Sequence, residues 1–411
     1  MEPFTEFADL REQARDALDG MVALRRTLHE WPELGNDLPV TRENVLGALD
    51  GLPLAITQHN TTSGIAALLD GGKPGPTVLL RADMDALPLH EDSGEESSSR
   101  IDGQMHACGH DTHTAMLVGA ARMLSDRRND IPGRVLFMFQ PGEEGFGGAE
   151  FMLDEGLLDV PARADGSESP VTGAYALHIT SFLPSGWIAS KGGSIMASAD
   201  TVQIVVTGRG GHASAPHHAL DPIPIACEIV QSLQMMITRT IDVFDPAVVT
   251  VGRITAGTTN NVIPETATIE ATIRAISEGT RAKVRDGIRR VAEGIAAAHD
   301  AGVSVDFADG YPVTVNDRMA ADFAIDLAGE VIGTDKVVRM PNPVMGAEDF
   351  SYVLNRLPGA MLFLGGTHEG RNPATAPANH SNRVLFDEAA MVSGASLYSA
   401  MALRHLTGAP A

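Results

Sequence analysis

Residues 134–140, with the sequence RVLFMFQ, form the apolar run that decides the class of fold. Two similar runs, TVLLR at 77–81 and AYALHI at 174–179, are also short and follow Gly or Pro, as is typical of strands buried on both faces. Between the first two runs, residues 110–124 are apolar on nearly every side, which predicts a buried helix. Strands that alternate with helices predict an α/β domain with a mostly parallel sheet flanked by helices.

The pattern changes near Ser190 and later returns to the first kind. In between, the sequence predicts strands at 201–207, 248–254, 267–275 and 303–307, and helices at 223–240 and 278–299. The resulting β-α-β-β-α-β order is typical of a ferredoxin-like domain. We therefore predict such a domain at 195–310, inserted into a discontinuous first domain of residues 1–194 and 311–411.

Composition and charge limit the classes of function. Thirty Lys and Arg against 53 Asp and Glu give a net charge of −23, which argues against binding to nucleic acid or to an anionic membrane surface. No apolar run approaches the roughly 18 residues that span a bilayer. Glu2, Glu6 and Asp9 make a secretory signal unexpected, and two cysteines, Cys108 and Cys227, give no disulfide framework. We expect a cytoplasmic protein.

The densest group of potential metal ligands lies in MHACGHDTHT, residues 105–114. It contains His106, Cys108, His110, Asp111 and His113. Thiolate, imidazole and carboxylate are the ligands that Zn²⁺ and related divalent ions prefer. A solvated loop with a capping aspartate is the alternative, but five such side chains within eight positions favour a metal site.

Two further groups of acids follow predicted strands. Glu143 and Glu144 lie in QPGEEGFGG, where one carboxylate can bind a metal while its neighbour takes a proton from water. Asp83 and Asp85 lie in RADMDALP, and such acids often orient a metal-bound imidazole. A solvated surface turn is the alternative for the glutamates, and the aspartate signal is weak when taken alone.

Several single residues are ambiguous without further evidence. His178 ends a predicted strand and His380 lies in PANHSN, and a lone histidine is more often a structural one. In the inserted domain, His212 follows GRGG and Asn261 lies in a loop between strands. Arg274 shares a strand face with Glu270, so a weak exposed ion pair is its alternative interpretation.

Taken together, these motifs resemble the M20 metallopeptidase family, in particular its amidohydrolase branch of N-acyl-amino-acid, hippurate and auxin-conjugate hydrolases. The matching segments occur in family order and span nearly the whole chain: RADMDALP, MHACGHDTHTAML, FQPGEEGFGGA, ALHI, GRGGHASAPH, TNNVIPETA, MGAEDFS and HSNRVLFDE. The resemblance implies a metal-dependent amidohydrolase that cleaves N-acyl amino acids to a carboxylic acid and a free amino acid. It also implies a catalytic domain, an inserted lid or dimerisation domain, and a homodimer.

The resemblance further implies a role for each residue. Two divalent ions, Zn or Mn, Co or Ni, would be held by Cys108, His110, Glu144, His178 and His380. Glu143 would be the general base, and His212 would stabilise the oxyanion, in family dimers sometimes in the partner's site. Asn261 and Arg274 would bind the substrate carboxylate, and Asp83, Asp85 and Asp111 would support the ligands.

Three alternatives remain open at the level of sequence. A dipeptidase of the same family would need a partner for the substrate's free amine. A cysteine-nucleophile hydrolase would use Cys108 with a nearby histidine. A non-catalytic metal- or peptide-binding protein would not need the glutamate base beside its ligands.

Overall fold

The computed structural model describes residues 7–408 and divides into two compact units, each with its own hydrophobic core. The first unit comprises Met1–Ile195, Val315–Asn342 and Tyr352–Ala411, and the second comprises Met196–Thr314 and Pro343–Ser351. The second unit thus includes Pro343–Ser351, a segment that lies outside the predicted insertion at 195–310. Glu2 and Glu6, which entered the expectation about localisation, lie outside the described residues. Among residues 7–408, no helix combines the length and apolarity that a membrane crossing requires.

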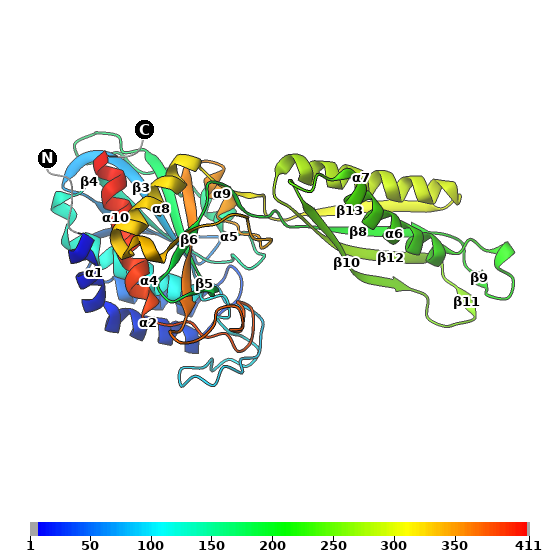
Figure 1. Cartoon of the computed structure of the whole chain (residues 1–411), viewed down its shortest axis with the longest axis horizontal. Coiled ribbons are helices and arrows are strands. Elements are labelled where there is room, and N and C mark those ends of the chain that lie inside the picture. Colours follow the sequence, from blue (N-terminus) through cyan, green and yellow to red (C-terminus); the bar gives the residue numbers. More distant parts are fainter. Residues whose placement is uncertain (1–6, 409–411) are drawn as a thin grey trace. The chain divides into compact units, whose positions relative to one another are not determined.

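The first unit is built on an eight-stranded mixed sheet with the order β1-β2-β4-β3-β5-β16-β6-β15 (Figure 1). In chain order these strands are β1 (Leu54–Gln58), β2 (Ile65–Asp70), β3 (Lys73–Asp83), β4 (Pro132–Gln140), β5 (Val171–Pro184), β6 (Ile188–Ser190), β15 (Val337–Arg339) and β16 (Gly359–Thr367). The central strands β4, β3, β5 and β16 are all parallel, whereas β1 and β2 pair antiparallel at one edge. The three strands expected from the apolar runs lie within β3, β4 and β5, which confirms a large, mostly parallel sheet in a mixed α/β fold.

Helices surround this sheet. They are α1 (Phe7–Asp16), α2 (Leu18–Glu30), α3 (Pro39–Leu49), α4 (His110–Asp126), α5 (Gly148–Asp154), α8 (Arg318–Ile332), α9 (Ser351–Leu354) and α10 (Ala390–Gly408). The predicted buried helix is α4, which packs on β3 and β5 and is itself covered by α2 and α10. Enclosure from several sides explains why this helix is apolar nearly all round.

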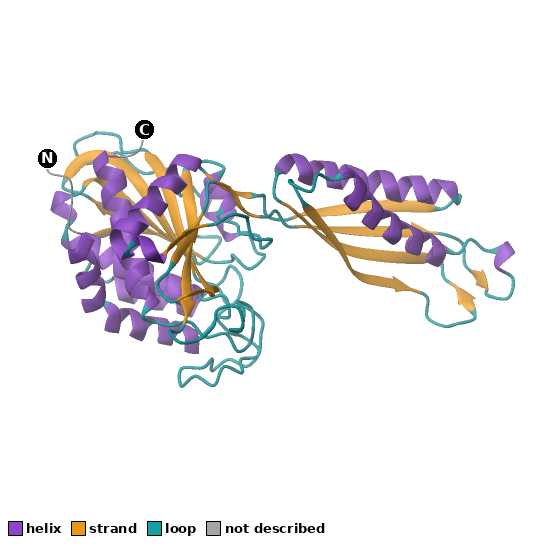
Figure 2. Cartoon of the chain, in the orientation of Figure 1, coloured by secondary structure: helices purple, strands orange, loops and turns teal. Residues whose placement is uncertain are grey.

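The second unit has the predicted order of elements: β8 (Asp200–Thr207), α6 (Pro222–Thr240), β10 (Ala247–Ala256), β12 (Thr266–Ala275), α7 (Glu278–Ala298) and β13 (Gly302–Asp309). The strands form an antiparallel sheet with the order β10-β12-β8-β13. Both helices cover the same face of this sheet (Figure 2), so burial alternates along β8 and β12. A separate two-stranded antiparallel ribbon pairs β9 (Gly211–His212) with β11 (Val262–Ile263), two strands that lie far apart in the chain. Two more short strands are β7 (Gly193–Met196) and β14 (Thr314–Asn316).

Candidate metal centre

The chemistry-bearing segments of the first unit meet at one edge of its sheet. β3 ends at Asp83 and β4 ends at Gln140 opposite it, and the longer β5 carries His178 at about the same level, two residues after Ala176, which pairs with Arg81. Because these strands are parallel, their carboxyl ends share one edge, where α/β proteins commonly build their sites. α4 begins at this edge with His110, so the loop before it brings Cys108 there as well.

Cys108 is the centre of two groups of potential ligand atoms. Its Sγ lies 3.3 Å from His178 Nε2 and 3.3 Å from His380 Nε2, and His380 Nε2 lies 3.2 Å from Glu144 Oε1. In the Cys108–His110–His178 group, and again in the Cys108–Glu144–His380 group, one ligand atom from each residue lies within 4.8 Å of the others. The five predicted ligands are therefore together, and Cys108 belongs to both groups.

The backbone fixes the direction in which two of these histidines offer a lone pair. His178 Nδ1 donates to the carbonyl of Ile179 at 2.7 Å, which leaves Nε2 as the acceptor that faces Cys108. His380 has a φ of +67°, in the left-handed region that residues other than glycine rarely adopt. Its amide donates to the carbonyl of Ala107, the residue before Cys108, at 2.9 Å.

Asp85 organises the loop that carries the two glutamates. One of its carboxylate oxygens accepts the amide of Glu143 and the other accepts the amide of Glu144, each at 3.0 Å. The same carboxylate lies 3.4 Å from His110 Nδ1. Glu143 is buried, with 6% of its surface exposed, so its carboxylate is held close to the ligands in a position shielded from solvent. Asp85 thus joins the glutamate loop to the first residue of α4.

Asp83 is surrounded by cationic and imidazole groups. Arg81 donates to it at 2.7 Å, and His113 Nδ1 lies 2.5 Å from its other oxygen. His113 Nε2 in turn accepts the amide of Ile179 at 2.6 Å, which places its proton on Nδ1. Burial alone would raise the pKa of Asp83, but Arg81, His110 and His113 outweigh it and hold that pKa well below its usual range. Asp83 is therefore a fixed negative charge beside the ligands.

The donor set fits a divalent metal. Both ring nitrogens of His110 are buried and lie 3.4 Å from Asp85 and 3.5 Å from Asp83, but neither contact has the geometry of a hydrogen bond in the described part of the chain. Burial acts to lower the pKa of His110, but the nearby Asp83 and Cys108 raise it well above the ordinary value. A buried imidazole among carboxylates and a thiol is a suitable environment for a cation, and the ligand types are those of zinc and its neighbours.

Two supporting residues were not assigned a role from the sequence. His113 belongs to the ligand-rich motif but holds Asp83 and the Ile179 backbone instead. Asn379 donates to the carbonyls of Cys108 and Ile179 at 3.3 and 3.0 Å, so it fixes the segment that ends in His380. The position of His113 three residues after His110 is a detectable helical signal. Asn379 gives no such signal, because its partners are far away in sequence.

The second unit holds the other three predicted site residues, and it brings only two of them together. His212 and Asn261 are exposed neighbours at the β9–β11 ribbon, where the amide of Ala213 donates to the carbonyl of Asn261 at 3.1 Å. Arg274 lies near the far end of β12, eight residues beyond Thr266, which corresponds to roughly 26 Å along a strand. Its alternative partner Glu270 instead pairs with Arg253 at 3.3 Å.

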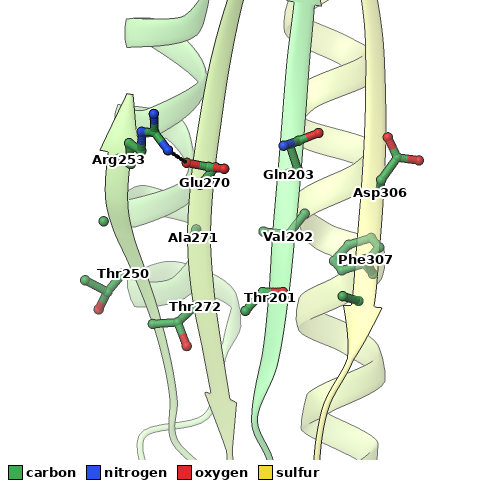
Figure 3. Close-up of a pocket in the computed structure, with 12 residues that line it drawn as sticks. Thr201, Val202, Gln203, Thr250, Arg253, Glu270, Ala271, Thr272, Asp306 and Phe307 are labelled. Carbon is green, nitrogen blue, oxygen red and sulfur yellow. Dashed lines mark ion pairs between the residues drawn. The ribbon is translucent and has the colours of Figure 1, made fainter. Parts of the chain in front are cut away.

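A groove of about 590 Å³ lies on the face of the second unit's sheet that the helices leave open (Figure 3). Its lining mixes apolar residues such as Val202 and Phe307 with polar ones such as Gln203, and it contains the Arg253–Glu270 ion pair. None of the predicted site residues lines it.

Known proteins are similar to this chain over most of its length. The model of peptidase family M20/M25/M40 matches residues 79–404. Thermostable carboxypeptidase 2 of Saccharolobus solfataricus is 37% identical over 96% of this chain and 98% of its own length. N-acetylcysteine deacetylase of Bacillus subtilis is 37% identical over 86% and 90%. A crystal structure from Bacillus subtilis, described as a dinuclear metal-binding peptidase of the M20 family, has a TM-score of 0.81 and 31% identity over 95% and 99%.

Proposed function

The chain belongs to peptidase family M20/M25/M40, and we propose that within this family of hydrolases it cleaves N-acyl amino acids to a carboxylic acid and a free amino acid. The observation that carries the proposal is the pair of ligand groups that share Cys108, with the buried carboxylate of Glu143 beside them. The deacetylase relative supports an acyl amide as the bond that is cleaved.

We propose two divalent ions, zinc or else manganese, cobalt or nickel. Cys108, His110 and His178 would hold one ion, and Cys108, Glu144 and His380 would hold the other. Bound metal would supply a water of lowered pKa and polarise the amide carbonyl. Asp83, Asp85 and Asp111 would keep the ligands oriented, because each makes contacts that fix the backbone or a ring near a ligand.

Glu143 is the proposed general base. Its carboxylate would accept a proton from the attacking water and then deliver it to the nitrogen of the leaving amino acid. Its backbone is fixed through Asp85, so its reach toward the ligands is set before substrate binds. Water adds to the acyl carbon, the C–N bond breaks, and the proton ends on the amine, so the hydrolysis is balanced.

His212, Asn261 and Arg274 would bind the substrate from the second unit. His212 would donate a hydrogen bond to the carbonyl oxygen as negative charge develops there, while Asn261 and Arg274 would contact the carboxylate. Within one chain, β12 begins just after the β9–β11 ribbon, at Thr266, and Arg274 lies roughly 26 Å further along this strand. That distance is far more than the length of an amino acid. We therefore propose that one site takes Arg274 from one subunit and His212 with Asn261 from its partner.

This division requires a homodimer. The order of strands and helices in the second unit supports its assignment as the inserted ferredoxin-like domain for dimerisation and substrate closure. Its strand β10 lies at the edge of the sheet, where it can pair with the same strand of a second copy across a two-fold axis.

The second candidate function is a peptidase, which the name of the carboxypeptidase relative favours. The two activities differ in the group that supplies the carbonyl of the cleaved amide bond. In an N-acyl amino acid it is an uncharged acyl group, whereas in a dipeptide it is an amino acid with a free amine. Metal-stripped enzyme should be reloaded separately with Zn²⁺, Mn²⁺, Co²⁺ and Ni²⁺ and assayed on N-acetyl and N-benzoyl amino acids and on dipeptides.

Metal-dependent hydrolysis of the acyl amino acids above the dipeptides is the expected result. Faster cleavage of dipeptides would instead establish the peptidase. Activity that survives metal removal but is lost on thiol alkylation would identify Cys108 as a nucleophile. Metal binding without turnover of any of these substrates would favour a non-catalytic binding protein.

A further inference from the structure

A buried ionic cluster lies behind the first turn of α4, where Asp111 meets Arg25 and His29, two residues to which the proposed mechanism gives no role. Arg25 and His29 project from α2 and are each 2% exposed, and Asp111 in α4 is fully buried. Arg25 Nε and His29 Nδ1 lie 2.8 Å from the same oxygen, Asp111 Oδ2. The other oxygen, Oδ1, accepts the amide of Thr112 at 2.8 Å. Asp111 is therefore fixed from both sides.

The outer ends of Arg25 and His29 are fixed as well. His29 Nε2 lies 3.1 Å from Glu91, and Arg25 NH1 lies 3.2 Å from Glu95 and 3.4 Å from Glu388. Glu91 also accepts the amide of Ser99 at 2.7 Å. Because both ring nitrogens of His29 face carboxylates, the ring cannot rotate without breaking an ionic hydrogen bond. The cluster is thus held at both ends, although the contact of Arg25 Nε with Asp111 has the distance of an ion pair without the geometry of a hydrogen bond.

Burying such charges is costly, so stability alone is a poor reason to have them. Replacing buried ion pairs by apolar residues is often neutral or stabilising. A carboxylate held by a guanidinium, an imidazole and an amide has a defined direction, however, which an apolar contact does not provide. Asp111 directly follows His110, whose ring belongs to the Cys108–His110–His178 group. Fixing Asp111 therefore fixes the turn of helix from which His110 projects.

We propose that Arg25 and His29 are positioning residues for the metal centre: through Asp111 they hold the first turn of α4 so that His110 is preset in its ligand direction. This inference rests on the metal site of the proposed function and is independent of the substrate. It predicts that both residues affect metal affinity and ligand geometry although neither belongs to the groups that could hold the ions.

The test uses Co²⁺ as a spectroscopic probe on the full-length, metal-stripped protein. Arg25→Lys retains charge without the guanidinium fork, His29→Ala removes the ring, and His29→Gln retains a hydrogen-bond donor. Arg26→Ala is the matched control, because Arg26 is the adjacent residue and binds Glu388 at 2.7 and 2.9 Å but is 54% exposed and does not reach Asp111. Affinity comes from competition with a chelator, and geometry from the visible absorption of bound Co²⁺.

Arg25→Lys and His29→Ala should each weaken Co²⁺ binding by about 10- to 100-fold and shift the absorption bands, as is typical when a residue that orients a ligand is removed. His29→Gln should recover part of the loss, and Arg26→Ala should stay within about twofold of wild type. Affinities and spectra equal to wild type in both Arg25→Lys and His29→Ala would overturn the inference, even if the melting temperature of the metal-free protein falls.

A double-mutant cycle provides a second decision, because it compares the double variant with the two single variants. If His29 acts through Asp111, the loss of affinity in Asp111→Asn with His29→Gln should be clearly smaller than the product of the two single losses. Independent, multiplicative losses would contradict the inference. Failure of the wild-type protein to bind Co²⁺ would instead refute the metal site of the proposed function, so the two failures are distinguishable.

Discussion

The Cys108 cluster in the first unit and the β9–β11 ribbon with His212 and Asn261 in the second differ in how they hold their side chains. Around Cys108, ligand rings and loops are fixed by buried hydrogen bonds to Asp85, Asp83 and backbone carbonyls. At the ribbon, His212 and Asn261 are exposed, and the hydrogen bonds of the His212 ring are local ones with the amide and hydroxyl of Ser214. The comparison indicates that the Cys108 cluster is preformed, whereas the proposed substrate contacts in the second unit are exposed and held by local hydrogen bonds.

The largest expected effect falls in the preformed region. Glu143→Gln keeps the size of the side chain and the backbone contacts to Asp85 but removes the base. We expect kcat to fall by about 10²–10⁴ with metal content unchanged, which is the usual contribution of a positioned acid–base group. Steady-state kinetics together with elemental analysis provide the measurement.

Wild-type turnover in Glu143→Gln would remove this residue from the mechanism. Loss of metal along with activity would show that Glu143 helps to hold the ions. Either result would weaken the contrast between the preformed Cys108 cluster and the exposed β9–β11 ribbon.

The next effect concerns Arg274, which is half-buried and whose side chain has no ion pair in the described part of the chain. Burial lowers its pKa, against the opposing influence of Asp200. If it binds the substrate carboxylate, Arg274→Ala should cost roughly 2–5 kcal/mol, or about 30-fold to several thousand-fold in kcat/KM.

The matched control for Arg274→Ala is the substrate amide, which lacks the carboxylate charge and should be cleaved about equally by variant and wild type. Arg253→Ala on the same sheet, which breaks an exposed ion pair, should leave both substrates unaffected. A variant that still prefers the acid as strongly as wild type does would make Arg274 structural.

A smaller effect concerns stability and pH in the first unit. Burial opposes the charged ring of His29, but hydrogen bonds to Asp111 and Glu91 outweigh it and raise its pKa to about 9. The stabilisation by the charged ring is therefore complete below the unfolded pKa near 6.5 and is lost as the pH rises through about 9. Metal-free wild type should lose roughly 1–3 kcal/mol more than His29→Gln between pH 6.5 and pH 9.5.

Urea unfolding of both proteins at the two pH values measures this difference, since groups common to both cancel. Equal losses in the two proteins would show that the cluster around Asp111 does not stabilise the charged ring. The preformed region would then be less constrained than its contacts indicate.

The smallest signal comes from mixing subunits, and it tests directly whether His212 of the β9–β11 ribbon serves the partner's site. Inactive His212→Ala and Glu143→Gln chains, mixed and allowed to exchange, should regain about a quarter of wild-type activity, because half the dimers are mixed and each has one intact site. Mass spectrometry verifies that exchange has taken place. No recovery after exchange would mean that each chain completes its own site.

Much of the site could be predicted because its residues lie close together in sequence or at strand ends. Cys108, His110 and Asp111 lie within four positions, and Glu143 with Glu144 follows a strand whose apolar run is unmistakable. Contacts across long stretches of chain gave no such signal. Asn379 meets Cys108 from 271 residues away, and His29 meets Asp111 from 82.

The same limit applies to the fold. Apolar runs predicted β3, β4, β5 and α4 in the first unit, and the pattern of the inserted segment predicted the four main strands and two helices of the second, since burial on a sheet or a helix face dictates such patterns locally. Pro343–Ser351 groups with the second unit although the chain around it belongs to the first. Nothing in the hydrophobic pattern of nine residues records such a grouping, because it depends on tertiary contacts. The separation of Arg274 from Asn261 follows from strand length and was available from the sequence, but motif order alone does not include distance.

The left-handed backbone of His380 has a consequence for engineering. A side chain in this region costs on the order of 1 kcal/mol or more relative to glycine. A search for thermostable variants would therefore select Gly or Asn at position 380 and find the melting temperature of the metal-free protein improved. The same substitution would remove the imidazole that faces Cys108 and Glu144, so at this position selection for a more durable chain and selection for a working one pull in opposite directions.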